Sequence, residues 1–137
     1  MGSSPAYANI VNNGAALLGA AETDLVAPAQ SSLILTAGTN GAKIEEITVE
    51  AAKAGTLVAT TVAGLVYLFL YDPVATVYRL FDVLVVTAVT PSATAAPFRI
   101  TKPYNNLVLG PNWLLRASQS VAGNASLLVC HAFGGNY

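Results

Sequence analysis

Short apolar runs, separated by turn-forming residues, recur along most of the chain. Eight such runs are visible, at residues 32–36, 43–51, 66–71, 76–86, 98–101, 107–109, 113–118 and 127–133. Their intervals are near the roughly eight to twelve residues that separate strands in a β-sandwich. No window places apolar residues at helical spacing behind a helix cap. The pattern therefore predicts an all-β domain with about eight strands, arranged as a two-layer antiparallel sandwich.

Turn residues and alternation refine this prediction. Thr39-Asn40-Gly41 tolerates positive φ and predicts a tight hairpin between residues 32–36 and 43–51. Asp72-Pro73 predicts a second hairpin. The residues expected to form the core are Leu33, Leu35, Ile47, Val49, Leu68, Leu80, Leu84, Leu107, Leu115 and Val129.

The run at residues 66–71 is apolar on both alternating faces. One face carries Val66, Leu68 and Leu70. The other carries Tyr67, Phe69 and Tyr71. Because a strand in a two-layer sandwich needs cover on one face only, the second face predicts a subunit interface. The alternative is that a long loop of the same chain covers it.

Residues 1–24 are rich in Ala, Asn, Gly and Ser and have no sustained period, so they predict an extended N-terminal arm. Residues 25–137 are expected to form the sandwich. The arm is expected to order only against a partner surface. Its apolar anchors are Tyr7, Ile10, Val11, Leu17 and Leu18.

Composition adds to this picture. Charged residues make up only 9% of the 137 residues and hydrophobic ones 54%, whereas about a quarter of an ordinary soluble domain is charged. Part of the surface is therefore expected to be covered by partners, and a homo-oligomer is predicted. The net charge of −1 and six scattered basic residues argue against nucleic-acid binding. The uncharged segment 54–71 contains Gly, Thr, β-branched and aromatic residues, so no membrane span is expected.

Candidate chemistry is sparse. The single cysteine, Cys130, and the single histidine, His131, are neighbours on a predicted strand and should face opposite sides. Glu46 and Glu50 share a face but lie about 13 Å apart along a strand, which is too far for a glycosidase pair. One of the two acids near Arg79, Asp72 or Asp82, is expected to form a salt bridge with it. The sequence predicts no enzyme, no metal site and no cofactor.

A resemblance to small structural proteins of tailed phages rests on four stretches. They are Val-Tyr-Leu-Phe-Leu-Tyr-Asp at residues 66–72, Tyr-Arg-Leu-Phe at 78–81, Val-Val-Thr-Ala-Val-Thr-Pro-Ser-Ala-Thr at 85–94, and Leu-Val-Leu-Gly-Pro-Asn-Trp-Leu-Leu-Arg-Ala-Ser at 107–118. The ending Phe-Gly-Gly-Asn-Tyr at residues 133–137 fits the same group. The first 60 residues carry no such likeness.

This resemblance implies a jelly-roll-like capsid decoration (cement) protein. Such a protein, with a trimer favoured, would be made in the host cytoplasm and would bind the major capsid protein on the outer surface of the virion head. A tail, baseplate or fibre-base component is the alternative within the virion. A different alternative is a carbohydrate-binding module, in which Trp113 and some of the six tyrosines would form a stacking platform.

Overall fold

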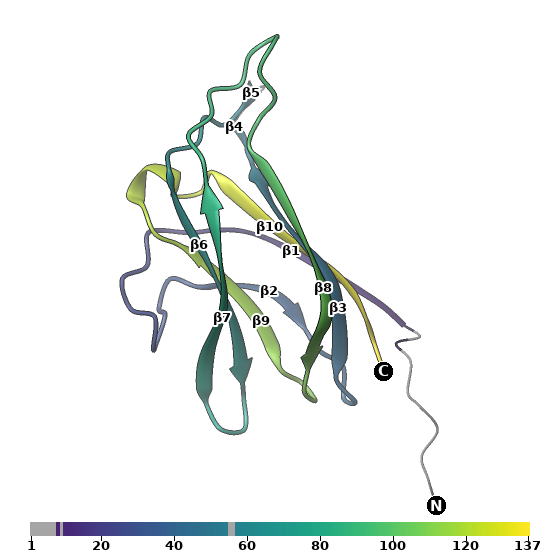
Figure 1. Ribbon diagram of the computed structural model, residues 1–137. Coiled ribbons are helices and arrows are strands. Elements are labelled where there is room, and N and C mark those ends of the chain that lie inside the picture. The colour runs from purple at the N-terminus through teal and green to yellow at the C-terminus, as the bar shows by residue number, and fades with distance from the viewer. Residues whose placement is uncertain (1–7, 9, 55–56) are drawn as a thin grey trace, which may run out of the picture.

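Two four-stranded antiparallel sheets pack face to face in the computed structural model, which describes residues 8, 10–54 and 57–137 (Figure 1). Sheet A has the order β1-β10-β3-β8, with β1 at Ile10–Leu17, β10 at Leu128–Asn136, β3 at Ala42–Ala51 and β8 at Arg99–Leu109. Sheet B has the order β2-β9-β6-β7, with β2 at Ser32–Thr36, β9 at Leu114–Gln119, β6 at Gly64–Asp72 and β7 at Val77–Val86. The predicted all-β sandwich of eight main strands is thereby confirmed.

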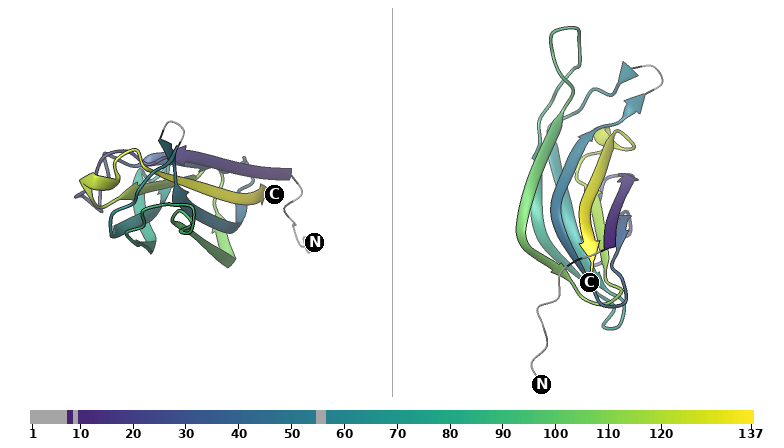
Figure 2. Two further views of the ribbon diagram at one scale, coloured as in Figure 1. Left: turned by 90° about the horizontal axis from the view of Figure 1, so that it is seen from above. Right: turned by 90° about the vertical axis from the view of Figure 1, so that its right-hand side faces the viewer.

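The remaining elements are small. Strands β4 (Lys53–Ala54) and β5 (Leu57–Val58) pair with each other, and the 3-10 helix η1 covers Ala122–Asn124. The β4–β5 pair and the loop at residues 87–98 project beyond one end of the two sheets (Figure 2). Within the described ranges, no helix has the length and apolar character needed to cross a membrane.

The turns only partly follow the prediction. The β6–β7 hairpin forms at Asp72-Pro73, where Asp72 Oδ1 accepts hydrogen bonds from the backbone N–H groups of Val74 and Ala75 at 2.9 and 3.2 Å. Gly41 has the positive φ, 93°, expected of a tight turn. The predicted hairpin there is nevertheless wrong, because β2 and β3 enter different sheets. The two runs at 98–101 and 107–109 belong to the single strand β8.

The core lies between the sheets, and six of the ten predicted residues are buried in it: Leu35, Ile47, Val49, Leu68, Leu84 and Leu115. Leu107 and Val129 are half-buried, while Leu33 and Leu80 are exposed. The two exposed leucines lie beside irregularities in strand register. In β2 the irregularity falls between Leu33 and Leu35. In β7 the extra residue is Phe81, because Leu68 pairs with Asp82 and Phe69 pairs with Leu80. An extra residue reverses the alternation of side chains, so a strict two-residue period misplaces these positions.

The N-terminal region differs from the predicted arm. Residues 10–17 form β1, which pairs along its whole length with β10, and Leu18 is fully buried in the core. Beyond it, both carboxylate oxygens of Glu22 accept backbone N–H groups, including that of Gln30 at 2.6 Å, and thereby organise the loop that leads to β2. These residues therefore order within the chain and need no partner to do so. Tyr7 lies outside the described residues.

Candidate functional site

The outer face of sheet B is the strongest candidate for a functional surface. Along β6, Val66 and Leu68 point into the core, so the alternating residues Tyr67, Phe69 and Tyr71 point away from it. Phe69 is fully buried yet is not part of the core cluster between the sheets. Its burial therefore comes from side chains on the outer face.

The strand register identifies these neighbours. Phe69 lies opposite Leu80 on β7 and Arg116 on β9, and Arg116 lies opposite Leu33 on β2. We call the resulting surface the sheet-B face, which comprises Leu33, Tyr67, Phe69, Tyr71, Tyr78, Leu80, Val83, Val85 and Arg116. Four of its apolar members are substantially exposed: Leu33 by 43%, Leu80 and Val83 by 39% each, and Val85 by 59%. Apolar side chains grouped in this way mark interaction sites more often than isolated ones do.

Aromatic packing explains why Phe69 is inaccessible. The rings of Phe69 and Tyr78 meet edge to face with centroids 6.3 Å apart, and Tyr78 also contacts Tyr71 at 4.5 Å. Of the three residues predicted to contact a partner from this strand, Tyr67 and Tyr71 are half-exposed on the sheet-B face. Phe69 has to be removed from that prediction, because its side chain has no surface left for a partner.

Arg116 is the charged member of the sheet-B face. Its Nε donates to Ser31 Oγ at 2.9 Å and its Nη2 to the Ser31 carbonyl oxygen at 2.8 Å. No acidic side chain pairs with it in the part of the chain that the structure describes. A guanidinium has five N–H donors, so this one retains donors that a partner's carbonyl or carboxylate can use. An apolar surface around a fixed donor suits a protein partner.

The outer face of sheet A is different, because it carries charged residues that form ion pairs. His131 Nε2 lies 2.8 Å from Glu50 Oε1, and Lys43 Nζ lies 3.3 Å from Glu45 Oε1. His131 also stacks on Phe133, with ring centroids 6.3 Å apart. The outer face of sheet A therefore carries both charged and aromatic side chains, whereas the sheet-B face is mainly apolar.

The predicted interface residues therefore fall on two separate surfaces. Ile10, Val11 and Leu17 are exposed on β1 at the edge of sheet A, whereas Tyr67 and Tyr71 lie on sheet B. Leu18 is fully buried and is not available to a partner. The sequence analysis missed Leu33, Leu80, Val83 and Val85 as surface residues. The adjacent apolar residues Leu80 and Phe81 were the available signal, since they interrupt alternation where the extra residue lies.

Cys130 and His131 lie on opposite faces of β10 and do not come together. Cys130 lies in the core, where burial raises the pKa of its thiol to about 12, while His131 points out of the sheet. The opposite orientation of these two neighbours agrees with the prediction from strand geometry. Among the described residues, no three His, Cys, Asp or Glu side chains come close enough to hold a metal ion.

Asp82 is paired differently from the expected salt bridge. Its Oδ2 accepts from Lys102 Nζ at 2.5 Å and from Tyr104 Oη at 2.7 Å, so β7 is joined to β8 across the open side of the sandwich. Arg79 instead lies over the Trp113 ring, 5.9 Å from its centroid. Among the described residues, neither Asp72 nor Asp82 forms a salt bridge with Arg79, so the predicted pairing is wrong. Asp72 instead accepts backbone N–H groups in the β6–β7 turn.

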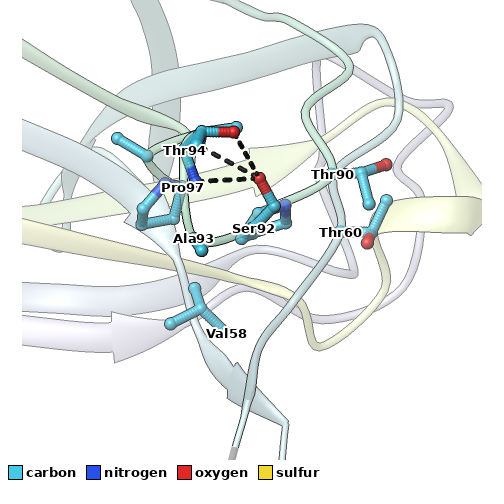
Figure 3. A pocket seen from close by; sticks show the side chains of 10 residues that line it. Val58, Thr60, Thr90, Ser92, Ala93, Thr94 and Pro97 are labelled. Atoms are coloured by element: carbon cyan, nitrogen blue, oxygen red, sulfur yellow. Dashed lines mark hydrogen bonds between the residues drawn. The ribbon is translucent and has the colours of Figure 1, made fainter.

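An open hollow of about 680 Å³ lies beside the projecting loop at residues 87–98 (Figure 3). Its lining includes Val58, Thr60 and the segment from Thr90 to Pro97, and none of these residues carries a charge. Ser92 Oγ is occupied in accepting the backbone N–H groups of Thr94 and Ala95 at 3.2 and 3.1 Å. The hollow offers hydroxyl and methyl groups but no acid or base.

The sequence matches no protein-family model, and comparisons with curated proteins and with solved structures find no similar protein. Function therefore has to be inferred from the surfaces of the molecule.

Proposed function

We propose that this protein is a structural component of a virion, a capsid decoration protein that binds the major capsid protein on the outer surface of the head. In this proposal it acts as a homo-oligomer, with a trimer favoured, and has no enzymatic role. The observation that carries the proposal is the sheet-B face, an exposed apolar surface spanning β2, β6 and β7. A passive structural protein needs such a contact surface and no reactive groups.

The distribution of charge supports the same proposal. The segments 54–71 and 83–98 contain no Asp, Glu, Lys or Arg, and together they include most of β6, the end of β7 and the projecting loop. A surface with few charges is poorly solvated when isolated but is suited to burial against other subunits. The resemblance of residues 66–118 to tailed-phage structural proteins favours the virion among the assemblies that would bury this surface.

Self-association through the sheet-B face can be tested with one double variant. Replacing Leu80 and Val83 by Glu places two charges on this face, and we expect the sedimentation coefficient of the oligomer to fall, because the subunits held through this face are lost. Val74→Glu is the matched control, because Val74 is 90% exposed in the β6–β7 turn outside the sheet-B face. An equal fall of the sedimentation coefficient in Val74→Glu, or an unchanged sedimentation coefficient in the double variant, would exclude this face as an interface.

Location in the virion needs a separate experiment. The purified protein is incubated with heads that lack it, the particles are pelleted, and the bound copies per particle are counted. A decoration protein should bind in hundreds of copies. A few copies per particle would favour the tail, baseplate or fibre-base alternative, and no binding to any virion part would contradict the proposal.

A carbohydrate-binding module is retained as the second candidate because Tyr67, Tyr71 and Tyr78 share the sheet-B face. Tyr71 and Tyr78 are inclined at 41° to each other, and Trp113 packs against the core. These rings therefore do not offer the flat platform on which a sugar stacks. Specific binding in a glycan screen, lost on Tyr67→Ala, would nevertheless favour this candidate over assembly.

A further inference from the structure

The four edge strands of the sandwich differ in how they are protected against pairing. β7 carries Arg79, Asp82 and an extra residue, and β8 carries charges, Pro103 and a register irregularity. β2 is only five residues long and is also irregular. β1 is eight residues long, has an unbroken register with β10, and contains neither a charge nor a proline. Long, regular, uncharged edges pair readily with another strand.

The pairing with β10 shows which backbone groups of β1 have no partner among the residues that the structure describes. The Leu18 N–H donates to the Leu128 carbonyl oxygen at 2.8 Å, so the even-numbered residues of this antiparallel ladder direct their N–H and C=O groups to β10. The groups of Val11, Asn13 and Ala15 consequently point to the open edge, and all three residues are exposed. Leu17 is different, because its carbonyl oxygen accepts from Ser32 Oγ at 3.1 Å.

We propose that β1 pairs antiparallel with β1 of a second copy of this chain, about a two-fold axis at Asn13. This register places Asn13 opposite Asn13 and Val11 opposite Ala15. The N–H and C=O groups of all three residues that point to the open edge are then hydrogen-bonded, and the Leu17 carbonyl group, which already accepts from Ser32, takes no part. The two A sheets then form one continuous sheet. The contact is separate from the sheet-B face and does not depend on the proposed function.

The second copy is favoured over another partner because the edge is complementary to itself. The three free residues are symmetric about Asn13, so a two-fold axis satisfies their donors and acceptors without any other sequence. Residues 10–17 contain no charge, and two copies therefore meet without electrostatic repulsion. Two asparagine amides that face each other across the axis can also exchange hydrogen bonds.

A cysteine placed on the axis tests the register directly. Directly opposed residues in a hydrogen-bonded antiparallel pair have Cα atoms about 5.5 Å apart, within the roughly 4.4–6.8 Å that a disulfide spans. With oxidised glutathione, Asn13→Cys should give a disulfide-linked dimer as the main species on a non-reducing gel. Ala15→Cys is the matched control. Its cysteines would be offset by about 13 Å along the strand and should give at least tenfold less dimer. The native Cys130 is buried and should not contribute.

A third variant removes the pairing edge while keeping the cysteine. Adding Ala15→Pro to Asn13→Cys deletes an N–H that points to the open edge, which leaves the bonds to β10 in place. Cross-linking should fall at least tenfold, and Ala15→Lys serves as a second blocking variant if the proline variant does not fold. Adding Leu80→Glu to Asn13→Cys should leave the cross-link unchanged. Equal cross-linking of Asn13→Cys and Ala15→Cys, persistence with both blocking variants, or loss with Leu80→Glu would overturn the proposal.

Discussion

At Asp82 a single carboxylate joins the two sheets on the side of the sandwich where β7 faces β8. Burial by itself raises the pKa of Asp82, but the hydrogen bonds from Lys102 and Tyr104 outweigh it and hold this pKa below its ordinary value of 3.8. Burial of the phenol, together with its hydrogen bond to the Asp82 carboxylate, raises the pKa of Tyr104. The cluster therefore stays ionised at Asp82 and neutral at Tyr104 across the physiological range.

The contribution of the Asp82 carboxylate to the stability of the fold should depend on pH. The pKa of Asp82 is lower in the folded protein than in the unfolded chain, so its ionised carboxylate stabilises the fold fully above about pH 4. This contribution to the free energy of unfolding is lost as the pH falls through the folded-state pKa. We expect Asp82→Asn to lower the free energy of unfolding by about 1 kcal/mol at pH 7, since Lys102 is partly exposed and the pair is screened. Urea unfolding at pH 7 and at pH 2.5 measures this. An equal difference between the two proteins at both pH values would contradict the assignment.

At the scale of elements, the sequence predicted strands well and their register poorly. The runs at residues 43–51 and 66–71 match β3 and β6 closely, because alternation over many residues is a strong signal. The exposed positions of Leu33 and Leu80 could not be predicted, since one inserted residue reverses the faces without changing composition. β1 was missed because Asn12, Asn13 and Gly14 look like loop residues, although at Gly14 the backbone of β1 passes close to the Ile34 carbonyl group of β2.

That close approach makes Gly14 sensitive to any side chain. A Cβ at Gly14 would lie 1.9 Å from the Ile34 carbonyl oxygen, so Gly14→Ala has to separate β1 from β2. We expect it to cost about 2 kcal/mol or more of unfolding free energy. Gly19→Ala is the control, because its Cβ would meet only the Gln30 carbonyl oxygen, at 3.8 Å. Chemical denaturation of both variants provides the measurement, and similar midpoints would show that β1 is held more loosely than described.

At the scale of the whole molecule, the sequence analysis predicted an apolar surface on β6 but not its extent. The sheet-B face combines residues from β2, β6, β7 and β9, and the order of these strands cannot be read from the residues between them. Its chemistry is mainly apolar, with Arg116 already bonded to Ser31. Association through this face should therefore draw little on ion pairs.

Salt distinguishes this kind of association from an electrostatic one. At about 1 M salt the Debye length falls to about 3 Å, which screens ion pairs at a surface but leaves apolar contacts intact. We expect the sedimentation coefficient of the oligomer to be the same in about 0.1 M and about 1 M NaCl. The Debye length falls about threefold over this range, so an assembly held by ion pairs would weaken. Dissociation at high salt would indicate that charged groups hold the assembly together.

The position of β10 has a consequence for how the protein is made. β10 lies between β1 and β3 in sheet A, and β9 lies between β2 and β6 in sheet B, so one of the two inner strands of each sheet comes from residues 114–119 or 128–136. While the chain is being synthesised, the earlier strands lack these inner partners. Until β9 and β10 emerge from the ribosome, β1, β2 and β3 expose unpaired backbone edges, which are prone to aggregate. The folding yield in the cell should consequently depend on how quickly the last quarter of the sandwich is completed.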